Sequence, residues 1–449
     1  MKRIIKRAVI VFIIILAYII GSLVLPPVFH PKTEDVTLGS SFTSERVACI
    51  DGNQDALIWR LRMIENAETE IILSTFGFST GSSGKDILCA LHAAAERGVT
   101  VRLLLDGFHG GKTMRDSEEF QALSTLPNVE VRLYNQIDLL QPWKANYRMH
   151  DKYLIVDDTM YMLGGRNTND LFLGNYSATP NIDRDLLVIG SGSLAQLRSY
   201  FEAVWAQPDC RIYSGKEDTA ALNTLRLRYD RLKTAYPNAF GFTDWENQTI
   251  PANSVTLLTG SVEVGTKAPT LWKSLCAHME QGENILIQTP YVICGREMYE
   301  DLAALTDGRN VTILTNSPET GANPFGCADY LNQQKKILDT GVSILEYAGD
   351  HSLHAKTILI DENISIVGSF NMDMRSAYID TETMLVIDCP ALNAKLRQGA
   401  KEMAADSLRI SPDGAETPGA SYEKGTLPFW NAVGIQLLRL VEGLFRHLL

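Results

Sequence analysis

Two stretches of the chain repeat one pattern of residues that can carry out phosphate chemistry. Each copy has a histidine, a lysine two residues later, an aspartate seven residues after the histidine, and an asparagine ten residues after that aspartate. The first copy consists of His150, Lys152, Asp157 and Asn167, and the second of His354, Lys356, Asp361 and Asn371. Lysine and asparagine side chains donate hydrogen bonds to anionic oxygens such as those of a phosphodiester. Histidine can attack phosphorus or transfer a proton near neutral pH.

Two facing copies would surround one phosphate group, so that one histidine could attack phosphorus while the other protonates the leaving oxygen. Each His-x-Lys pair opens an apolar, β-branched run, which predicts a strand. The histidine and the lysine then share one face of that strand. Asp157 and Asp361 have the opposite parity and stand in turn-like stretches. We therefore interpret these two aspartates as structural residues that support the site from behind.

The elements around each copy also repeat. The first half predicts strands at 70–78, 99–106, 128–134 and 185–189 and helices at 55–66 and 84–97. The second half predicts strands in the same order at 284–289, 310–315 and 341–347. This alternation predicts an α/β fold with largely parallel sheets covered by helices. An internal duplication should pack about a pseudo-twofold axis, which would bring both histidine strands to one cleft.

The N-terminus carries four basic residues within 2–7, followed by an uncharged apolar run over 8–25. As a helix this run would span about 27 Å, close to the thickness of a bilayer core. A secretory signal peptide usually has a shorter apolar region and a small-residue cleavage site, whereas this run ends in Pro26-Pro27. We expect an uncleaved single-pass anchor in the cell membrane. The basic cluster would keep the N-terminus inside and place the catalytic body on the extracytoplasmic side.

Six segments follow from these patterns. They are an anchor at 1–27, a polar tether at 28–45, a first α/β domain at 46–215, a connecting segment at 216–252, a second α/β domain at 253–405, and a tether with a C-terminal amphipathic helix at 406–449. The connecting segment has basic residues at helical spacing, which form either a solvated face or a rim for anionic lipid headgroups. The C-terminal helix either lies in the membrane interface or docks on the core.

Composition narrows the function classes. The formal net charge is -12, which disfavours nucleic acid as a partner. The seven cysteines are scattered without the spacing of a metal site, so we expect no metal and no cofactor. Their odd number fits either reduced thiols or one or two disulfides beside buried free cysteines.

The doubled H-x-K-x4-D-x6-G-[GS]-x-N motif resembles the phospholipase D superfamily, and within it the bacterial cardiolipin synthases. The run from Gly368 to Ser376 is similar to the second motif of those enzymes, and the run from Gln288 to Tyr291 is similar to one of their strands. The resemblance covers about residues 50 to 400. It implies two tandem phospholipase D-like α-β-α sandwich domains related by pseudo-twofold symmetry, besides the N-terminal transmembrane helix.

The resemblance also implies a role for each residue. It makes His150 the nucleophile that forms a phosphohistidine and His354 the general acid, although the sequence itself leaves their order open. It also implies that four further motif residues bind the non-bridging phosphate oxygens, namely Lys152, Lys356, Asn167 and Asn371. In this family an acid shortly after the asparagine orients each histidine, a role that falls to Glu382 in the second half and to Asp185 in the first.

These implications, together with the anchor, predict a membrane-bound phosphatidyltransferase. Its expected reaction converts two molecules of phosphatidylglycerol into cardiolipin and glycerol. The alternative is a hydrolytic phosphodiesterase of the same superfamily, either a phospholipase D or a nuclease. The acceptor alcohol and the oligomeric state are not encoded in any motif.

Overall fold

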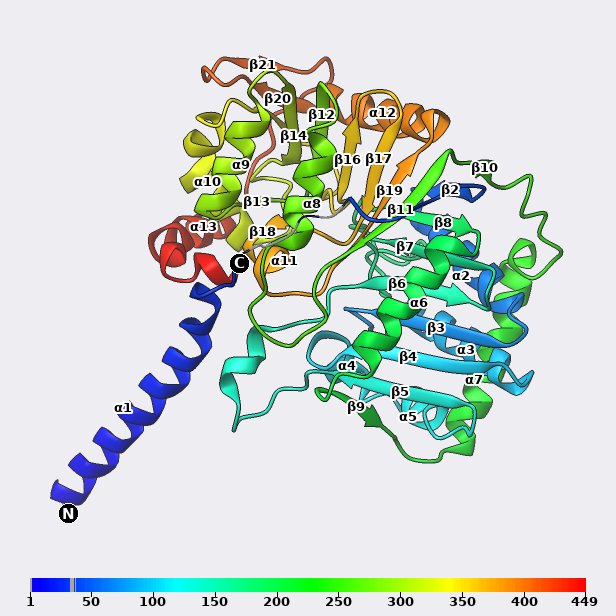
Figure 1. Cartoon of the computed structure of the whole chain (residues 1–449). Helices are drawn as coiled ribbons and strands as arrows, with labels where there is room; N and C mark the ends of the chain where they lie inside the picture. Colours follow the sequence, from blue (N-terminus) through cyan, green and yellow to red (C-terminus); the bar gives the residue numbers. More distant parts are fainter. Residues whose placement is uncertain (1, 33–35, 37) are drawn as a thin grey trace.

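Two mixed sheets dominate the computed structural model, which describes residues 2–32, 36 and 38–449 (Figure 1). The first sheet has nine strands in the order β10 (Ile250–Pro251), β2 (Arg46–Ile50), β8 (Asp185–Ile189), β7 (Met160–Gly164), β6 (Lys152–Val156), β3 (Glu70–Thr75), β4 (Thr100–Asp106), β5 (Val129–Tyr134) and β9 (Cys210–Tyr213). The second has ten strands in the order β1 (Ser41–Phe42), β11 (Ser254–Thr259), β19 (Thr383–Asp388), β17 (Ile364–Gly368), β16 (Thr357–Ile360), β12 (Asn284–Gln288), β14 (Asn310–Asn316), β15 (Ser343–Tyr347), β20 (Ser407–Ile410) and β21 (Glu416–Pro418). A small third sheet pairs β13 (Val292–Ile293) with β18 (Met372–Asp373).

The strand orders of the two large sheets confirm the duplication. The order β2-β8-β7-β6-β3-β4-β5-β9 in the first sheet corresponds strand for strand to β11-β19-β17-β16-β12-β14-β15-β20 in the second. The outermost strands on one side are exchanged. β10 leads into the second half but pairs with β2, and β1 leads into the first half but pairs with β11. Backbone hydrogen bonds therefore join the two halves at one edge of each large sheet.

The expectation of largely parallel sheets is wrong. Within the two large sheets, the described strands that pair in parallel are β3, β4 and β5 and their counterparts β12, β14 and β15. The motif strand β6 pairs antiparallel with both β3 and β7. Strands joined by a short turn, such as β6 and β7, have to run antiparallel, whereas parallel neighbours need a crossover connection.

Helices cover both faces of each sheet. Those of the first half are α2 (Asn53–Glu65), α3 (Ser82–Glu96), α4 (His109–Met114), α5 (Glu118–Leu123), α6 (Gly192–Trp205) and α7 (Thr219–Ala235), and those of the second are α8 (Thr270–Met279), α9 (Arg296–Leu305), α10 (Pro324–Leu338), α11 (Met374–Tyr378) and α12 (Pro390–Ala405). Each half has an apolar core of its own. A third core lies between the sheets, where residues such as Leu197 of α6 and Leu396 of α12 pack with strands of both halves. The two halves therefore share one packed interface.

Two expected boundaries change. The segment 216–252 is not a free connection, because α7 packs on α3 and α5 and contributes Leu225, Tyr229 and Leu232 to the first core. The second half also extends beyond residue 405, since β20 pairs with β15.

Of the basic side chains on α7, Arg226 binds Glu96 and Arg228 binds Asp86. In Figure 1, α7 lies on the opposite side of the molecule from α1, which removes the support for a lipid-facing rim.

The C-terminus lies beside the end of α1 that joins the body, and the N-terminus lies at the far tip of that helix (Figure 1). Within the described residues, α1 (Lys2–Val24) is the one helix long and apolar enough to cross a membrane, and it projects from the body with exposed side chains. At the other terminus, α13 (Phe429–Val441) docks on α10 through Ile435. Short 3-10 turns complete the fold, namely η1 (Pro26–Val28), η2 (Pro142–Asn146), η3 (Pro237–Ala239), η4 (Glu442–Leu444) and η5 (Arg446–Leu448). All seven cysteines are free thiols.

Candidate active site

The two motifs meet where the halves touch. Each histidine stands in the loop just before its motif strand, β6 or β16. Two short parallel bridges join the halves at this point, Met149 with Thr381 and Ile182 with Leu353. The two bridges are related as the halves are. They place the histidine loop of each half against the acidic loop of the other.

Each histidine is paired with a carboxylate from the opposite half. Nδ1 of His150 lies 2.8 Å from Oε1 of Glu382, and Nδ1 of His354 lies 2.6 Å from Oδ2 of Asp183. Both carboxylate side chains are fully buried. A carboxylate at Nδ1 fixes the tautomer and leaves Nε2 for chemistry. Neither histidine would be oriented in this way by its own half alone.

The expectation that Asp185 orients a histidine is wrong. Its carboxylate accepts hydrogen bonds from Arg60 at 3.0 Å and from Arg166 at 3.3 Å inside the first half. Asp183, two residues earlier, makes the contact with His354. Asp185 therefore neutralises two buried guanidinium groups.

Strand register explains this shift of two residues. Gly164 of β7 stands opposite Asp185, whereas its counterpart Gly368 of β17 stands opposite Met384. Counting back two residues from each partner gives Asp183 in one half and Glu382 in the other. These two acids occupy equivalent positions.

The two carboxylates differ in their surroundings. Glu382 accepts a hydrogen bond at 2.6 Å from the hydroxyl of Ser376 and another from that of Ser369. The first half has Gly165 in place of Ser369, and a Cβ atom there would lie 2.3 Å from Oδ1 of Asp183. The shorter acid therefore sits closer to the backbone of its own half, and the longer acid is held by serines.

Both lysines are buried beside the histidines. The ammonium groups of Lys152 and Lys356 each donate to the backbone carbonyl of their own motif histidine, and Nζ of Lys356 lies 3.2 Å from Nε2 of His354. Burial lowers the pKa of Lys152 to about 7 and that of Lys356 to about 8, although Glu382 and Asp183 oppose the shift. Both pKa values are therefore near neutral pH, and a bound anion would stabilise the charged form of each lysine.

The acid pair is electrostatically asymmetric. Burial raises the pKa of Glu382 to about 7 against the opposing charge of Lys152. Burial would also raise the pKa of Asp183, but the charges of Lys356 and His354 bring it below its ordinary value. Burial and the neighbouring lysines lower the pKa of both histidines, that of His354 to about 4 and that of His150 well below its ordinary value. Asp183 is thus the more strongly ionised of the two acids.

The two motif asparagines lie in different surroundings. Nδ2 of Asn371 donates to the hydroxyl of Tyr291 at 3.2 Å, and its buried Oδ1 has no hydrogen-bond partner in the described part of the chain. Oδ1 of Asn167 accepts the backbone N–H of Gly77 at 3.1 Å. A side chain at Gly77 would crowd Asn167, since a Cβ there would lie 3.1 Å from its Cγ.

Asp157 and Asp361 lie at the far end of the motif strands, away from the histidines. Both adopt a positive φ, 50° and 43°, at the turn that follows the strand. Asp157 accepts the backbone N–H groups of 68–70, and Asp361 accepts those of 283–284. Each aspartate therefore anchors the start of the neighbouring strand, β3 or β12, and holds the motif strand in register.

Lys267 is a buried residue near the site that no sequence pattern singled out. Its Nζ has no hydrogen-bond partner among the residues that the structure covers, and its side chain is almost fully buried. Burial lowers its pKa to about 8, opposed by Asp380, Asp151 and Glu382. It stands in the loop between β11 and α8, so neither motif spacing nor periodicity could indicate it.

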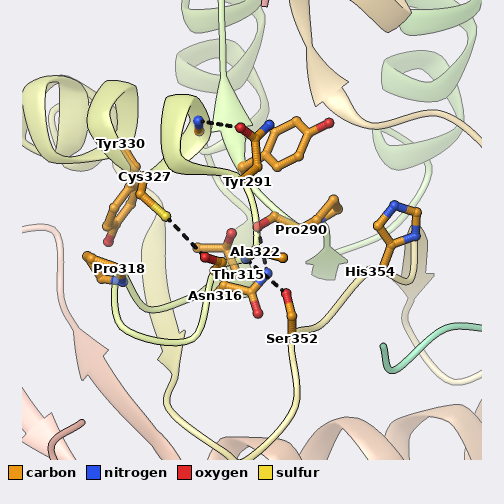
Figure 2. A pocket seen from close by; sticks show the side chains of 13 residues that line it. Pro290, Tyr291, Thr315, Asn316, Pro318, Ala322, Cys327, Tyr330, Ser352 and His354 are labelled. Carbon is orange, nitrogen blue, oxygen red and sulfur yellow. Dashed lines mark hydrogen bonds between the residues drawn. The ribbon is translucent and has the colours of Figure 1, made fainter. Parts of the chain in front are cut away.

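A small pocket opens beside His354 (Figure 2). Its volume is about 50 Å³, enough for a few water molecules or a small polar group. Its lining is mostly apolar and includes residues of the 318–323 loop, with Tyr291, Asn316 and Ser352 as polar neighbours. The amide of Asn316 is already bonded to the backbone of Pro290 and Leu353, so a substrate group next to His354 would meet a mostly apolar wall of the second half.

Known proteins share this architecture. The family model described as "Cardiolipin synthase, PLD-like domain" matches residues 61–205 and 275–404. Cardiolipin synthase C of Escherichia coli (strain K12) is 27% identical over 390 residues, which cover 76% of this chain and 81% of that protein. Cardiolipin synthase 1 of Bacillus cereus is 27% identical over 340 residues, 73% of this chain and 60% of that protein. The crystal structure of a phosphatidylserine synthase from Haemophilus influenzae superposes with a TM-score of 0.63 at 15% identity, over 90% of this chain and 95% of that one.

The family match covers more than half of the chain and includes both histidine motifs. The similarity to the Haemophilus structure extends the shared fold over nearly the whole length. This chain belongs to the cardiolipin synthase, PLD-like domain family.

Proposed function

We propose that the chain is a membrane-anchored phosphatidyltransferase that makes cardiolipin and glycerol from two molecules of phosphatidylglycerol. The observation that carries the proposal is the pair of histidines, each held at Nδ1 by a buried carboxylate of the opposite half and each beside a buried lysine. Two oriented imidazoles on one phosphate suit a transfer in two steps. The names of the related cardiolipin synthases support phosphatidylglycerol as substrate.

His150 acts as the nucleophile in this proposal. Its Nε2 attacks phosphorus, a P–N bond forms, and the P–O bond to glycerol breaks while His354 donates a proton to the leaving oxygen. The hydroxyl of the second phosphatidylglycerol then attacks phosphorus, gives its proton to His354, and releases His150. The asymmetry of the acids supports this order. The more strongly ionised Asp183 stabilises a protonated His354, whereas Glu382, with its raised pKa, favours a neutral His150.

The lysines and asparagines bind the phosphate group in this proposal. As charge shifts onto the non-bridging oxygens in the transition state, Lys152 and Lys356 supply positive charge from fixed, buried positions. The amide of Asn371 is held in place by its hydrogen bond to the hydroxyl of Tyr291. These groups are in place before substrate arrives, so little reorganisation is needed at the moment of reaction.

The exposed apolar residues support a membrane orientation. α1 packs against η2 in the loop that leads to His150, and this loop exposes Leu139 and Leu140 by 87% and 85%. The apolar face of α13 is exposed on the same side of the molecule (Figure 1). We place this side against the outer leaflet, with the basic N-terminus inside and the body outside.

The test uses the purified full-length chain with phosphatidylglycerol in mixed micelles. Isotopic label in the headgroup glycerol allows mass spectrometry to follow both products. We expect cardiolipin and free labelled glycerol in equal amounts, and neither product with His150→Ala. Phosphatidic acid as the lipid product would assign the chain to hydrolysis. Cleavage of single-stranded DNA with no lipid product would refute the proposal in favour of a nuclease.

A further inference from the structure

A long apolar groove runs between α13 and the loop at 318–324. Its volume is about 910 Å³, at the upper end of the range for small-molecule sites, about 300–1,000 Å³. The lining from α13 includes Trp430, Leu437 and Leu440, whose exposed fractions are 77%, 60% and 81%. The helix is docked on Cys327 and Ala328 of α10 through Ile435, which also lines the groove. The groove is thus walled by a helix that the fold holds in place.

One end of this groove adjoins the active site. Pro318, Gly321 and Ala322 line both the groove and the small pocket beside His354 (Figure 2). The hydroxyl of Thr315 in that pocket is buried and has no hydrogen-bond partner within the described ranges. A ligand could therefore lie with an apolar part in the groove and a polar part next to His354.

The groove also lies at the expected membrane surface. Beyond α13, Nε2 of His447 lies 2.8 Å from the backbone carbonyl of Val24, the last residue of α1. Nearby, the backbone carbonyl of Leu448 accepts a hydrogen bond from Arg375 in the second motif. The C-terminal turns therefore connect the end of α1 to the second motif, and α13 precedes them on the side of the molecule that we place against the membrane.

We propose that the groove binds one acyl chain of a phospholipid whose phosphate lies against His354. The proposal rests on the proposed function, because it takes the substrate to be a phospholipid. With 13 residues, α13 is about 20 Å long, more than the roughly 15 Å of one leaflet core. A whole acyl chain can thus follow the helix. The apolar lining and the connection to the small pocket beside His354 select a lipid over a peptide helix or a second copy of the chain.

Gly434 offers a way to block the groove without disturbing the fold. It lines the groove, and a Cβ atom there meets nothing within 4 Å. Gly434→Phe therefore places a ring in the groove, and a helical glycine is a position where other residues are favourable. Gly399→Phe is the matched control, because Gly399 lies in α12 and its Cβ also meets open space.

The first readout is chain-length selectivity, the ratio of kcat/KM for dioleoyl- to dihexanoyl-phosphatidylglycerol. We expect Gly434→Phe to lower this ratio at least tenfold, and Gly399→Phe to leave it within twofold of wild type. An unchanged ratio in Gly434→Phe, or an equal fall in both variants, would overturn the proposal.

The second readout needs no turnover, so it separates the groove from the proposed function. The probe is lysophosphatidylglycerol with a brominated acyl chain, used below its critical micelle concentration. It should quench the fluorescence of Trp430, which is measured as the difference in signal between the wild type and Trp430→Phe. We expect quenching in the wild type and little in Gly434→Phe. Equal quenching in both, or quenching by brominated vesicles alone, would mean that Trp430 meets the bilayer and no bound chain. If the wild type were quenched but transferred no phosphatidyl group, the groove would still bind an acyl chain and the proposed function would be refuted.

Discussion

Replacing Asp183 with asparagine removes the charge that holds His354 and keeps the shape of the side chain. The carboxylate lies 2.6 Å from Nδ1 of the imidazole and is fully buried. An opposite charge at such a distance stabilises protonated histidine by about 1–3 pKa units, each worth about 1.4 kcal/mol. In the proposed mechanism His354 protonates the leaving alcohol, and this step should therefore slow by about 10- to 1,000-fold.

The assay compares two leaving groups. Glycerol needs a proton as it leaves, whereas p-nitrophenol does not, so Asp183→Asn should lose kcat on phosphatidylglycerol but keep a burst of nitrophenol from phosphatidyl-p-nitrophenol. The matched control is Asp185→Asn, which leaves the buried Arg60 and Arg166 unpaired. Breaking such a buried pair costs about 3–5 kcal/mol. The control should therefore lower Tm and keep the ratio of the two activities.

Two results would refute this reasoning. If Asp183→Asn retained the full kcat on phosphatidylglycerol, His354 would need no ionised partner and would not act as the acid. If both activities fell equally and Tm did not change, the carboxylate would serve the nucleophile, and the roles of His150 and His354 would have to be exchanged.

Three further predictions follow from the same geometry. His354→Ala should stall as a phosphatidyl adduct after one turnover of phosphatidyl-p-nitrophenol, and peptide mass spectrometry should find the added mass on the peptide with His150; an adduct on no histidine would exclude a covalent step. Tungstate should bind with both lysines charged, so its affinity should fall at least about tenfold as pH rises from 6.5 to 8.5 through the pKa values of Lys152 and Lys356. Calorimetry would show this, and a flat profile would contradict it. Lys267→Met should raise Tm, because it removes an unpaired buried ammonium group. It should also shift the acidic limb of the pH profile of kcat/KM to higher pH, because Glu382 loses a nearby positive charge; an unshifted limb would leave Lys267 only a structural role.

The strands and helices were largely predictable, because period and spacing are local properties. The strand expected at 310–315 is Asn310–Asn316, and the one expected at 185–189 is Asp185–Ile189. Strand direction was less accessible. Alternation of helices and strands suggested parallel neighbours, but the turn of three residues between β6 and β7 and the edge pairings make most neighbours antiparallel. These pairings depend on tertiary contacts that periodicity does not contain.

The choice between Asp183 and Asp185 was not decidable from the sequence. The two acids have the same parity, so they point to the same face of an extended segment. Spacing does not help either, since Asp183 stands 16 positions after Asn167 whereas Glu382 stands 11 positions after Asn371. Only the register between β7 and β8 distinguishes the two acids, and that register is set by the hydrophobic faces packed against both layers.

The crossed pairing of histidines and acids gives the duplication a chemical meaning. A single half would hold a histidine, a lysine and an acid, but the acid would have no histidine to orient, because each of these contacts spans the interface. The exchanged edge strands and the core shared by both sheets make that interface part of the fold itself. Equivalent positions in the two halves can therefore hold different acids, Asp183 and Glu382, so that the two histidines differ in charge preference. In a duplicated chain a symmetric pair of half-sites can thus become one nucleophile and one acid, a division of labour that two identical copies in a symmetric dimer could not build into their sequence.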